Sequence, residues 1–77
     1  MPGEQSCHPV ATLWQLEFND ERICCAVYHA GDGLEMRLEA GAATILTEPF
    51  EIRPRALARV EALRRSLKRR GWHDLAG

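Results

Sequence analysis

The sequence lacks the features that would place it in a membrane or in an oxidising compartment. No run approaches the roughly 18 apolar residues of a membrane-spanning helix. The N-terminal MPGEQSCHPV has neither the basic nor the apolar segment of a secretory signal. The three cysteines are odd in number, and Cys24 and Cys25 are adjacent, which is not the pattern of a disulfide framework. We therefore expect a cytoplasmic protein with reduced thiols.

Motifs for metal binding and for covalent catalysis are also missing. The residues of the right type for zinc are Cys7, His8, Cys24, Cys25 and His29. Adjacent residues of a strand point to opposite faces, so Cys24 and Cys25 cannot both hold one ion without a bulge. Neither thiol has the loop or helix N-terminus that would lower its pKa beside His29 or His73. We expect no metal site, no cofactor and no catalytic residue, and the sequence identifies no small-molecule ligand.

The length and composition fit one small globular domain. The chain has 77 residues, of which 45% are apolar and 27% charged. A chain of this size buries only about 60% of its unfolded surface, so oligomerisation would be a natural supplement to a marginal stability. Residues 1–11, with three helix- or strand-breaking Pro and Gly residues and no periodicity, predict a flexible arm, and residues 12–77 the domain.

Residues 12–29 predict a β-hairpin. The first strand, 12–18, alternates apolar with polar side chains, which is typical of a half-buried strand. Asn19-Asp20 predicts a two-residue type I′ turn because both residue types tolerate a positive φ. The register that follows pairs Phe18 with Glu21, Leu16 with Ile23 and Trp14 with Cys25. The second strand, 22–29, is apolar on both faces, which indicates a central strand.

Two further strands are expected before residue 50. Gly31-Asp32-Gly33 predicts a turn, with Asp32-Gly33 the stronger hairpin signal. The third strand, 34–39, alternates cleanly, with Leu34, Met36 and Leu38 inward. After Ala40-Gly41 we expect a short fourth strand, 42–47, with Ile45 inward, that ends before Pro49. Residues 48–52 are then a connector.

The stretch RPRALARVEALRRSLKRRGW, residues 53–72, predicts one amphipathic helix and its ends. Pro54 suits the first helical position and disfavours a helical conformation at the residue before it. The apolar stripe, within about 60° of arc, consists of Ala56, Val60, Leu63 and Leu67, with Leu57 on its flank. Gly71 is placed to end the helix in a left-handed conformation, and Trp72 to pack back on Leu67.

These elements predict an α+β fold, ββββα: an antiparallel meander of three to four strands with one C-terminal helix across one face. The pattern resembles small uncharacterised bacterial proteins in which a β-meander, with a Cys on its second strand and a Gly-containing turn, precedes an Ala- and Arg-rich helix ending in Gly-Trp. The resemblance spans about residues 12–73. It implies a four-stranded sheet plus helix, and it carries no activity, cofactor or site residues.

Charge is divided between the two parts of the chain. Residues 1–52 hold nine acidic residues and two arginines, a net −7, whereas residues 53–70 hold eight basic residues and Glu61, a net +7. Such asymmetry is typical of a partner for polyanions, or of an acidic sheet complemented by a basic helix in one molecule. The candidate phosphate contacts, pointing to water, are Arg55, Arg59, Arg65 and Arg69. Against nucleic acid stand the overall charge of −1 and the lack of an interleaved aromatic platform.

The face of the sheet away from the helix is the stronger candidate surface. In the predicted registers it carries Leu13, Ala26, Tyr28, Arg37, Thr44 and Leu46. An apolar patch there, made chiefly by Leu13, Tyr28 and Leu46 beside Arg37, would suit a homodimer or another protein partner. We therefore expect a non-enzymatic interaction module that self-associates through this open face. The alternative is a nucleic-acid-binding accessory protein that uses the basic helix 53–70.

Overall fold

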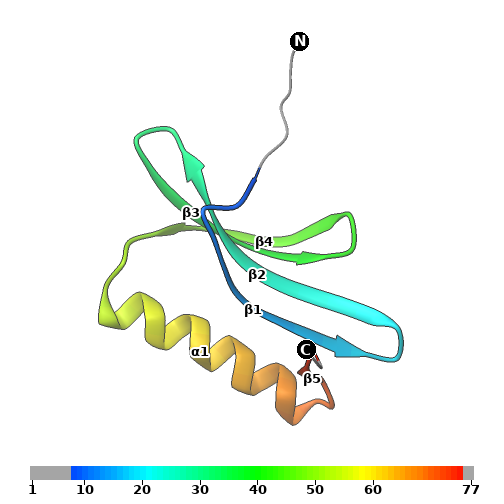
Figure 1. Ribbon diagram of the computed structural model, residues 1–77. Coiled ribbons are helices and arrows are strands. Elements are labelled where there is room, and N and C mark those ends of the chain that lie inside the picture. The colour runs from blue at the N-terminus through cyan, green and yellow to red at the C-terminus, as the bar shows by residue number, and fades with distance from the viewer. Residues whose placement is uncertain (1–7, 76–77) are drawn as a thin grey trace.

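The computed structural model describes residues 8–75 and shows one α+β domain built on a single sheet (Figure 1). The elements are β1 (Ala11–Phe18), β2 (Glu21–Ala30), β3 (Gly33–Ala40), β4 (Ala43–Phe50), α1 (Pro54–Arg69) and β5 (His73–Asp74). The antiparallel sheet has the order β4-β3-β2-β1-β5, and α1 lies across one face. The predicted meander and C-terminal helix are confirmed, whereas the two-residue β5, paired with β1, was not predicted.

The first hairpin follows the predicted turn and register. Asn19 and Asp20 both have positive φ, 50° and 67°, and Leu16 and Trp14 lie opposite Ile23 and Cys25. The sheet begins earlier than the predicted domain boundary, because β1 starts at Ala11 and the amide of Val10 donates to the Val27 carbonyl at 2.6 Å. Of the predicted arm, residues 1–7 lie outside the described part of the chain.

The second turn is shifted by one residue from the prediction. Ala30 pairs with Gly33, so the two loop residues are Gly31 and Asp32 rather than Asp32 and Gly33. Gly31 has φ +59°. A glycine at the first central position is what a type II′ hairpin turn requires, and Gly33 becomes the first residue of β3.

Strand β4 differs most from its prediction, because a β-bulge shifts its register. Leu38 lies opposite Leu46, but Glu39 lies opposite Thr44, which leaves Ile45 as the extra residue. Leu46 therefore faces the core, and Ile45, predicted inward, is 55% exposed. The strand also runs through Pro49 to Phe50. Proline is tolerated there because β4 is an edge strand, so no neighbour needs its missing N–H.

Helix α1 ends as the sequence predicts. Arg53, before Pro54, is extended, with φ −140° and ψ 153°. At the other end Gly71 has φ +109°. Its amide donates to the Lys68 carbonyl and that of Trp72 to the Leu67 carbonyl, each at 3.1 Å, which is the Schellman arrangement. No helix in residues 8–75 is both long and apolar enough to cross a membrane.

The core lies between the sheet and α1. Its largest side chains with less than 2% exposure are Leu16, Met36 and Cys25, one from each of three neighbouring strands. The predicted stripe of α1 covers them: Val60 is buried, and Ala56, Leu63 and Leu67 pack against the cluster. The indole N–H of Trp14 donates to the Val60 carbonyl at 3.2 Å and so joins β1 to the middle of the helix. Phe50, predicted to lie in a connector, is also buried.

Candidate functional site

The four residues of the predicted partner surface do not lie on one face. Tyr28 and Arg37 are on the face away from α1, opposite Glu35 and Ala26 respectively. Leu46 packs against the helix-side core because of the bulge in β4. Leu13 lies at a second irregularity, where the register with β2 shifts between Thr12 and Trp14, and it also packs against the helix-side core. The predicted placement of Leu13 and Leu46 is therefore wrong.

A polar network covers the face on which Tyr28 and Arg37 remain. The guanidinium carbon of Arg37 stands 4.2 Å from the centre of the Tyr28 ring, and its Nε is 2.6 Å from Glu35 Oε2. The Tyr28 hydroxyl donates to Glu39 Oε1 at 2.8 Å. This hydrogen bond, together with burial, raises the pKa of Tyr28. Because Tyr28 is itself only 8% exposed, this face presents charge where the sequence predicted an apolar patch.

Exposed apolar side chains gather instead on the other side of the sheet, where β1 begins, β4 ends and α1 begins. They surround a hollow of about 240 Å³, the apolar groove, lined by Val10, Ala11, Leu13, Val27, Leu34, Phe50, Ile52 and Leu57. Three of these side chains are well exposed: Val10 at 49%, Leu57 at 47% and Ile52 at 75%. The groove was not predicted, because Val10 and Ile52 lie in segments expected to be an arm and a connector. The signal in the sequence that could have indicated the groove is that Val10 and Ile52, both β-branched and apolar, lie outside any predicted helix or strand.

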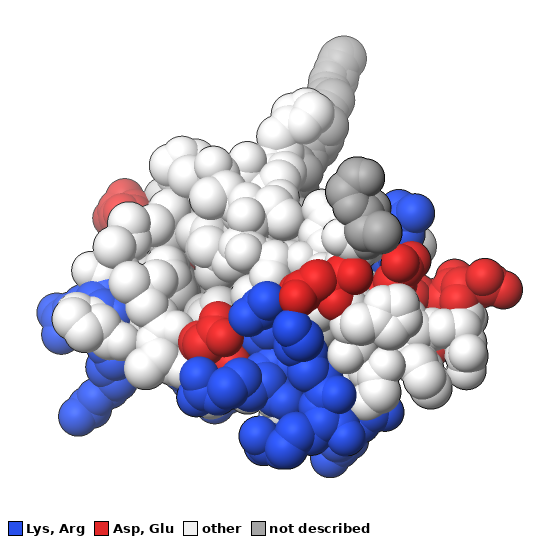
Figure 2. All heavy atoms as spheres, turned by 60° about the horizontal axis from the view of Figure 1, so that its bottom comes forward, with Lys and Arg blue, Asp and Glu red and all other residues white. Residues whose placement is uncertain are grey.

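Lys and Arg side chains form one large patch over α1 and a smaller group apart from it, and acidic side chains border the large patch (Figure 2). Five of the eight basic residues in 53–70 lie within 4.0 Å of a carboxylate: Arg53, Arg59, Arg64, Arg65 and Lys68. Asp74 of β5 accepts hydrogen bonds from Lys68 and Arg64, which lower the pKa of its carboxyl. Much of the positive charge of the helix is thus matched by acids of the same molecule.

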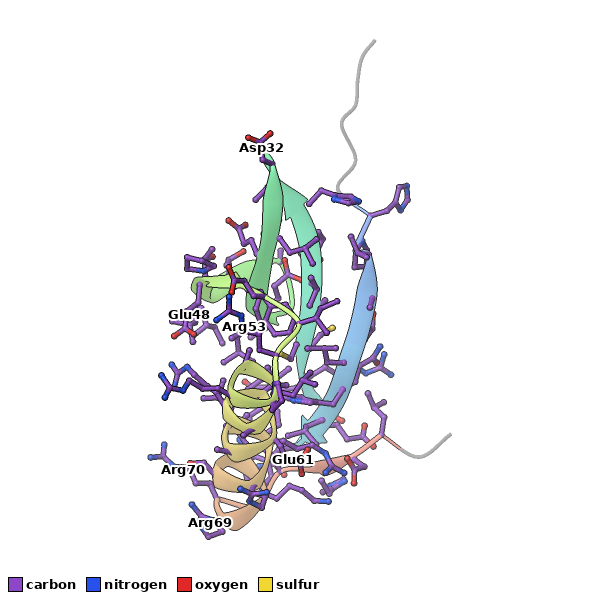
Figure 3. All side chains as sticks on the ribbon, turned by 90° about the vertical axis from the view of Figure 1, so that its left-hand side faces the viewer. Asp32, Glu48, Arg53, Glu61, Arg69 and Arg70 are labelled. Carbon is purple, nitrogen blue, oxygen red and sulfur yellow. The ribbon has the colours of Figure 1, made fainter. Side chains whose placement is uncertain are left out.

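The four predicted phosphate contacts have different surroundings. Arg59 makes a two-point contact with Glu48, and this contact lowers the pKa of that carboxyl. Arg65 lies 4.0 Å from Glu61. Arg55 and Arg69 have no carboxylate within 4.0 Å among residues 8–75, but they stand near opposite ends of α1, about 21 Å apart along its axis at the rise of a helix. Arg70 is similarly placed beside Arg69, and both point away from the sheet (Figure 3).

The two described thiols are held in their neutral form. Burial raises the pKa of Cys25 to about 11, and burial with the charge of Glu39 raises the pKa of Cys24. A thiol with a raised pKa is a poor nucleophile near neutral pH. Within residues 8–75 no group of three or more His, Cys, Asp or Glu side chains is arranged to hold a metal ion. Cys7, another residue of the right type for zinc, lies outside the described residues.

Comparison of the chain with protein-family models, with curated proteins and with solved structures finds no match.

Proposed function

We propose that this protein is a non-enzymatic interaction module that associates with a second copy of itself through the apolar groove. The observation that carries the proposal is the groove's wholly apolar lining, with Val10, Ile52 and Leu57 exposed around it. A contiguous apolar patch rimmed by polar residues is typical of an interaction surface, whereas apolar residues scattered singly are not.

The groove offers both halves of a self-complementary contact. Ile52 projects at its edge with 75% of its surface exposed, and the hollow beside it has the dimensions of an aliphatic side chain or two. In a two-fold dimer the same patch faces itself, so the projecting residue of each copy meets the hollow of the other. A projection and a hollow in one patch therefore favour a second copy over an unrelated partner.

Charge around the groove is compatible with such a contact. The chain segment next to Ile52 carries both signs, with Glu51 and Arg53 forming an exposed pair at 2.6 Å and Arg55 following. In a two-fold arrangement these charges can meet their opposites across the interface. The net charge of −1 gives two copies little mutual repulsion. The small core also favours association, because a dimer would bury apolar surface that a single 77-residue chain leaves in contact with water.

Sedimentation velocity over a range of protein concentrations tests this proposal. The wild-type mass should rise from 8.7 kDa toward twice that value. Leu57→Asp should move the transition to at least about tenfold higher concentration, because a carboxylate would be desolvated in the contact. Ile52→Asp should act in the same direction.

The control variant is Ile45→Asp, which places the same charge on another exposed isoleucine, on the β4 bulge outside the groove. It should leave the association unchanged. Circular dichroism should show that all three variants remain folded, since each position is at least 47% exposed. A wild-type chain that stays monomeric at millimolar concentration would contradict self-association through the groove.

Nucleic-acid binding is the second candidate, and one observation favours it. Arg55, Arg69 and Arg70 have no carboxylate within 4.0 Å in the described part of the chain, and Arg69 and Arg70 point away from the sheet (Figure 3). Phosphate contacts from such arginines would give an affinity that falls steeply with salt. The ion pairs that occupy the other five basic residues of the segment 53–70 make this candidate the weaker one.

The nucleic-acid function predicts a mobility shift of single-stranded or duplex oligonucleotides at low salt. Between about 50 and 200 mM salt the affinity should fall by one to several orders of magnitude, depending on the number of phosphates contacted. Arg69→Glu should weaken it, and adding Arg65→Glu should abolish it. Arg22→Glu is the matched control, because it reverses one charge on the opposite face of the sheet. Absence of a shift at low salt removes this candidate and leaves self-association untouched.

A further inference from the structure

A second hollow lies on the other side of the start of α1, between that helix and β4. It has a volume of about 350 Å³, within the range of small-ligand pockets. Its apolar floor is formed by Met36, Phe50, Ala56 and Val60. Phe50 also lines the apolar groove, so the two hollows share this residue, while Leu57 borders the groove and Ala56 the pocket.

The rim of this pocket is charged. Glu48 on β4 and Arg53 just before α1 lie on the same side of the molecule, near the helix start (Figure 3). Glu48 is held by Arg59, and Glu51 by Arg53. Arg55 is the rim residue that has no carboxylate within 4.0 Å among residues 8–75, and the first turn of α1 contains no acid to neutralise it. Three arginines and two glutamates leave one net positive charge.

We propose that this pocket binds an amphipathic carboxylate, a small molecule or chain end with one carboxylate and an apolar tail. The tail lies along Pro49 and Ala56, above the buried side chains of the floor, where it replaces water against apolar surface. The carboxylate meets the guanidinium of Arg55, whose planar donors match two carboxylate oxygens. A few polar groups at the mouth of an apolar hollow are the usual composition of a ligand site.

The rim charges select a monoanion over a phosphate. A single unpaired guanidinium provides one positive charge, which one carboxylate neutralises. A phosphate monoester carries close to two negative charges at neutral pH. Its second charge would face Glu48 and Glu51, which line the same rim. The glutamates thus act against dianionic ligands while they hold Arg59 and Arg53 in place.

Calorimetric titration of the full chain with octanoate tests the proposal, with 1-octanol and octyl phosphate as comparison ligands. We expect saturable 1:1 binding of octanoate in the millimolar range, as suits a ligand of about ten heavy atoms. Octanol and octyl phosphate should bind at least about fivefold more weakly. Arg55→Gln should weaken octanoate binding about tenfold, because the charge-assisted contact is lost, and Arg55→Lys should weaken it less.

Two control variants make the test specific. Arg69→Gln removes an equally unpaired arginine at the far end of α1 and should leave octanoate binding unchanged. Leu57→Asp, which tests self-association, alters the groove and not this pocket, so the two proposals fail separately. The inference is overturned if wild type shows no saturable octanoate binding, if Arg55→Gln binds as well as wild type, or if octanol or octyl phosphate binds as tightly as octanoate.

Discussion

Replacing Trp14 by alanine is expected to lower the free energy of unfolding by about 3–5 kcal/mol, the usual cost of removing a large buried aromatic side chain. Trp14 is 9% exposed, lies opposite Cys25, and reaches across the core to donate its indole N–H to the Val60 carbonyl. It therefore contributes both apolar contact and a polar link between β1 and α1. A domain of 77 residues has about 4–12 kcal/mol of stability in total, so much of the chain should be unfolded after this change.

Urea denaturation followed by far-ultraviolet circular dichroism measures the effect without relying on tryptophan fluorescence. Trp14→Phe keeps most of the apolar volume and loses the donor, so it should cost about 1–2 kcal/mol. Ile45→Ala is the control: it removes apolar atoms from a side chain that is 55% exposed and should change stability by less than about 0.5 kcal/mol. Equal effects of Trp14→Ala and Ile45→Ala would contradict the packing of α1 on β1.

The contrast between these residues shows how far the sequence predicts the fold. The register of Trp14 and Leu16 against β2 could be predicted because it depends on local chemistry. Asn19 and Asp20 accept a positive φ, and strict alternation then fixes which side chains face the core. The ends of α1 depend on equally local properties, the fixed φ of Pro54 and the freedom of Gly71.

The prediction of the candidate surface failed at the two places where alternation is interrupted. A bulge adds one residue and exchanges the faces of all that follow, and no residue type marks it uniquely. Ile45 and Leu46 are adjacent and both apolar, so the sequence cannot tell which of them faces the core. Leu13 beside Trp14 presents the same ambiguity. These two irregularities move Leu13 and Leu46 from the open face to the helix side of the sheet.

The groove and the pocket depend on distant segments and so lie beyond local patterns. Each hollow is lined by the end of β4 and the start of α1, and Phe50 lines both. Its position in the core follows once β4 is known to continue through Pro49, which the sequence argued against. The pairing of Arg59 with Glu48 has the same origin, because residues 11 apart meet only after the chain has turned from strand to helix.

Replacing Gly71 by alanine is expected to cost about 2–3 kcal/mol of stability, because a backbone strain and a close contact coincide at this position. Its φ of +109° lies outside the conformations that alanine adopts without strain. A Cβ there would also stand 3.1 Å from Cε1 of Phe18, whose ring packs against Trp72 with 5.6 Å between the ring centres. Relief of either strain would disturb the turn that joins α1 to β5 and holds Trp72 on the core.

Two other glycines separate the backbone cost from the contact with Phe18. Gly41 has φ +62° with open space around its Cα, so Gly41→Ala should show the backbone cost alone, about 1 kcal/mol. Gly33 has no positive φ and open space, so Gly33→Ala should stay within about 0.5 kcal/mol of wild type. Urea midpoints in the order Gly33→Ala, Gly41→Ala, Gly71→Ala, from most to least stable, are the expected result. If Gly71→Ala were no less stable than Gly41→Ala, the close approach of Phe18 would contribute nothing to the choice of glycine at the end of α1.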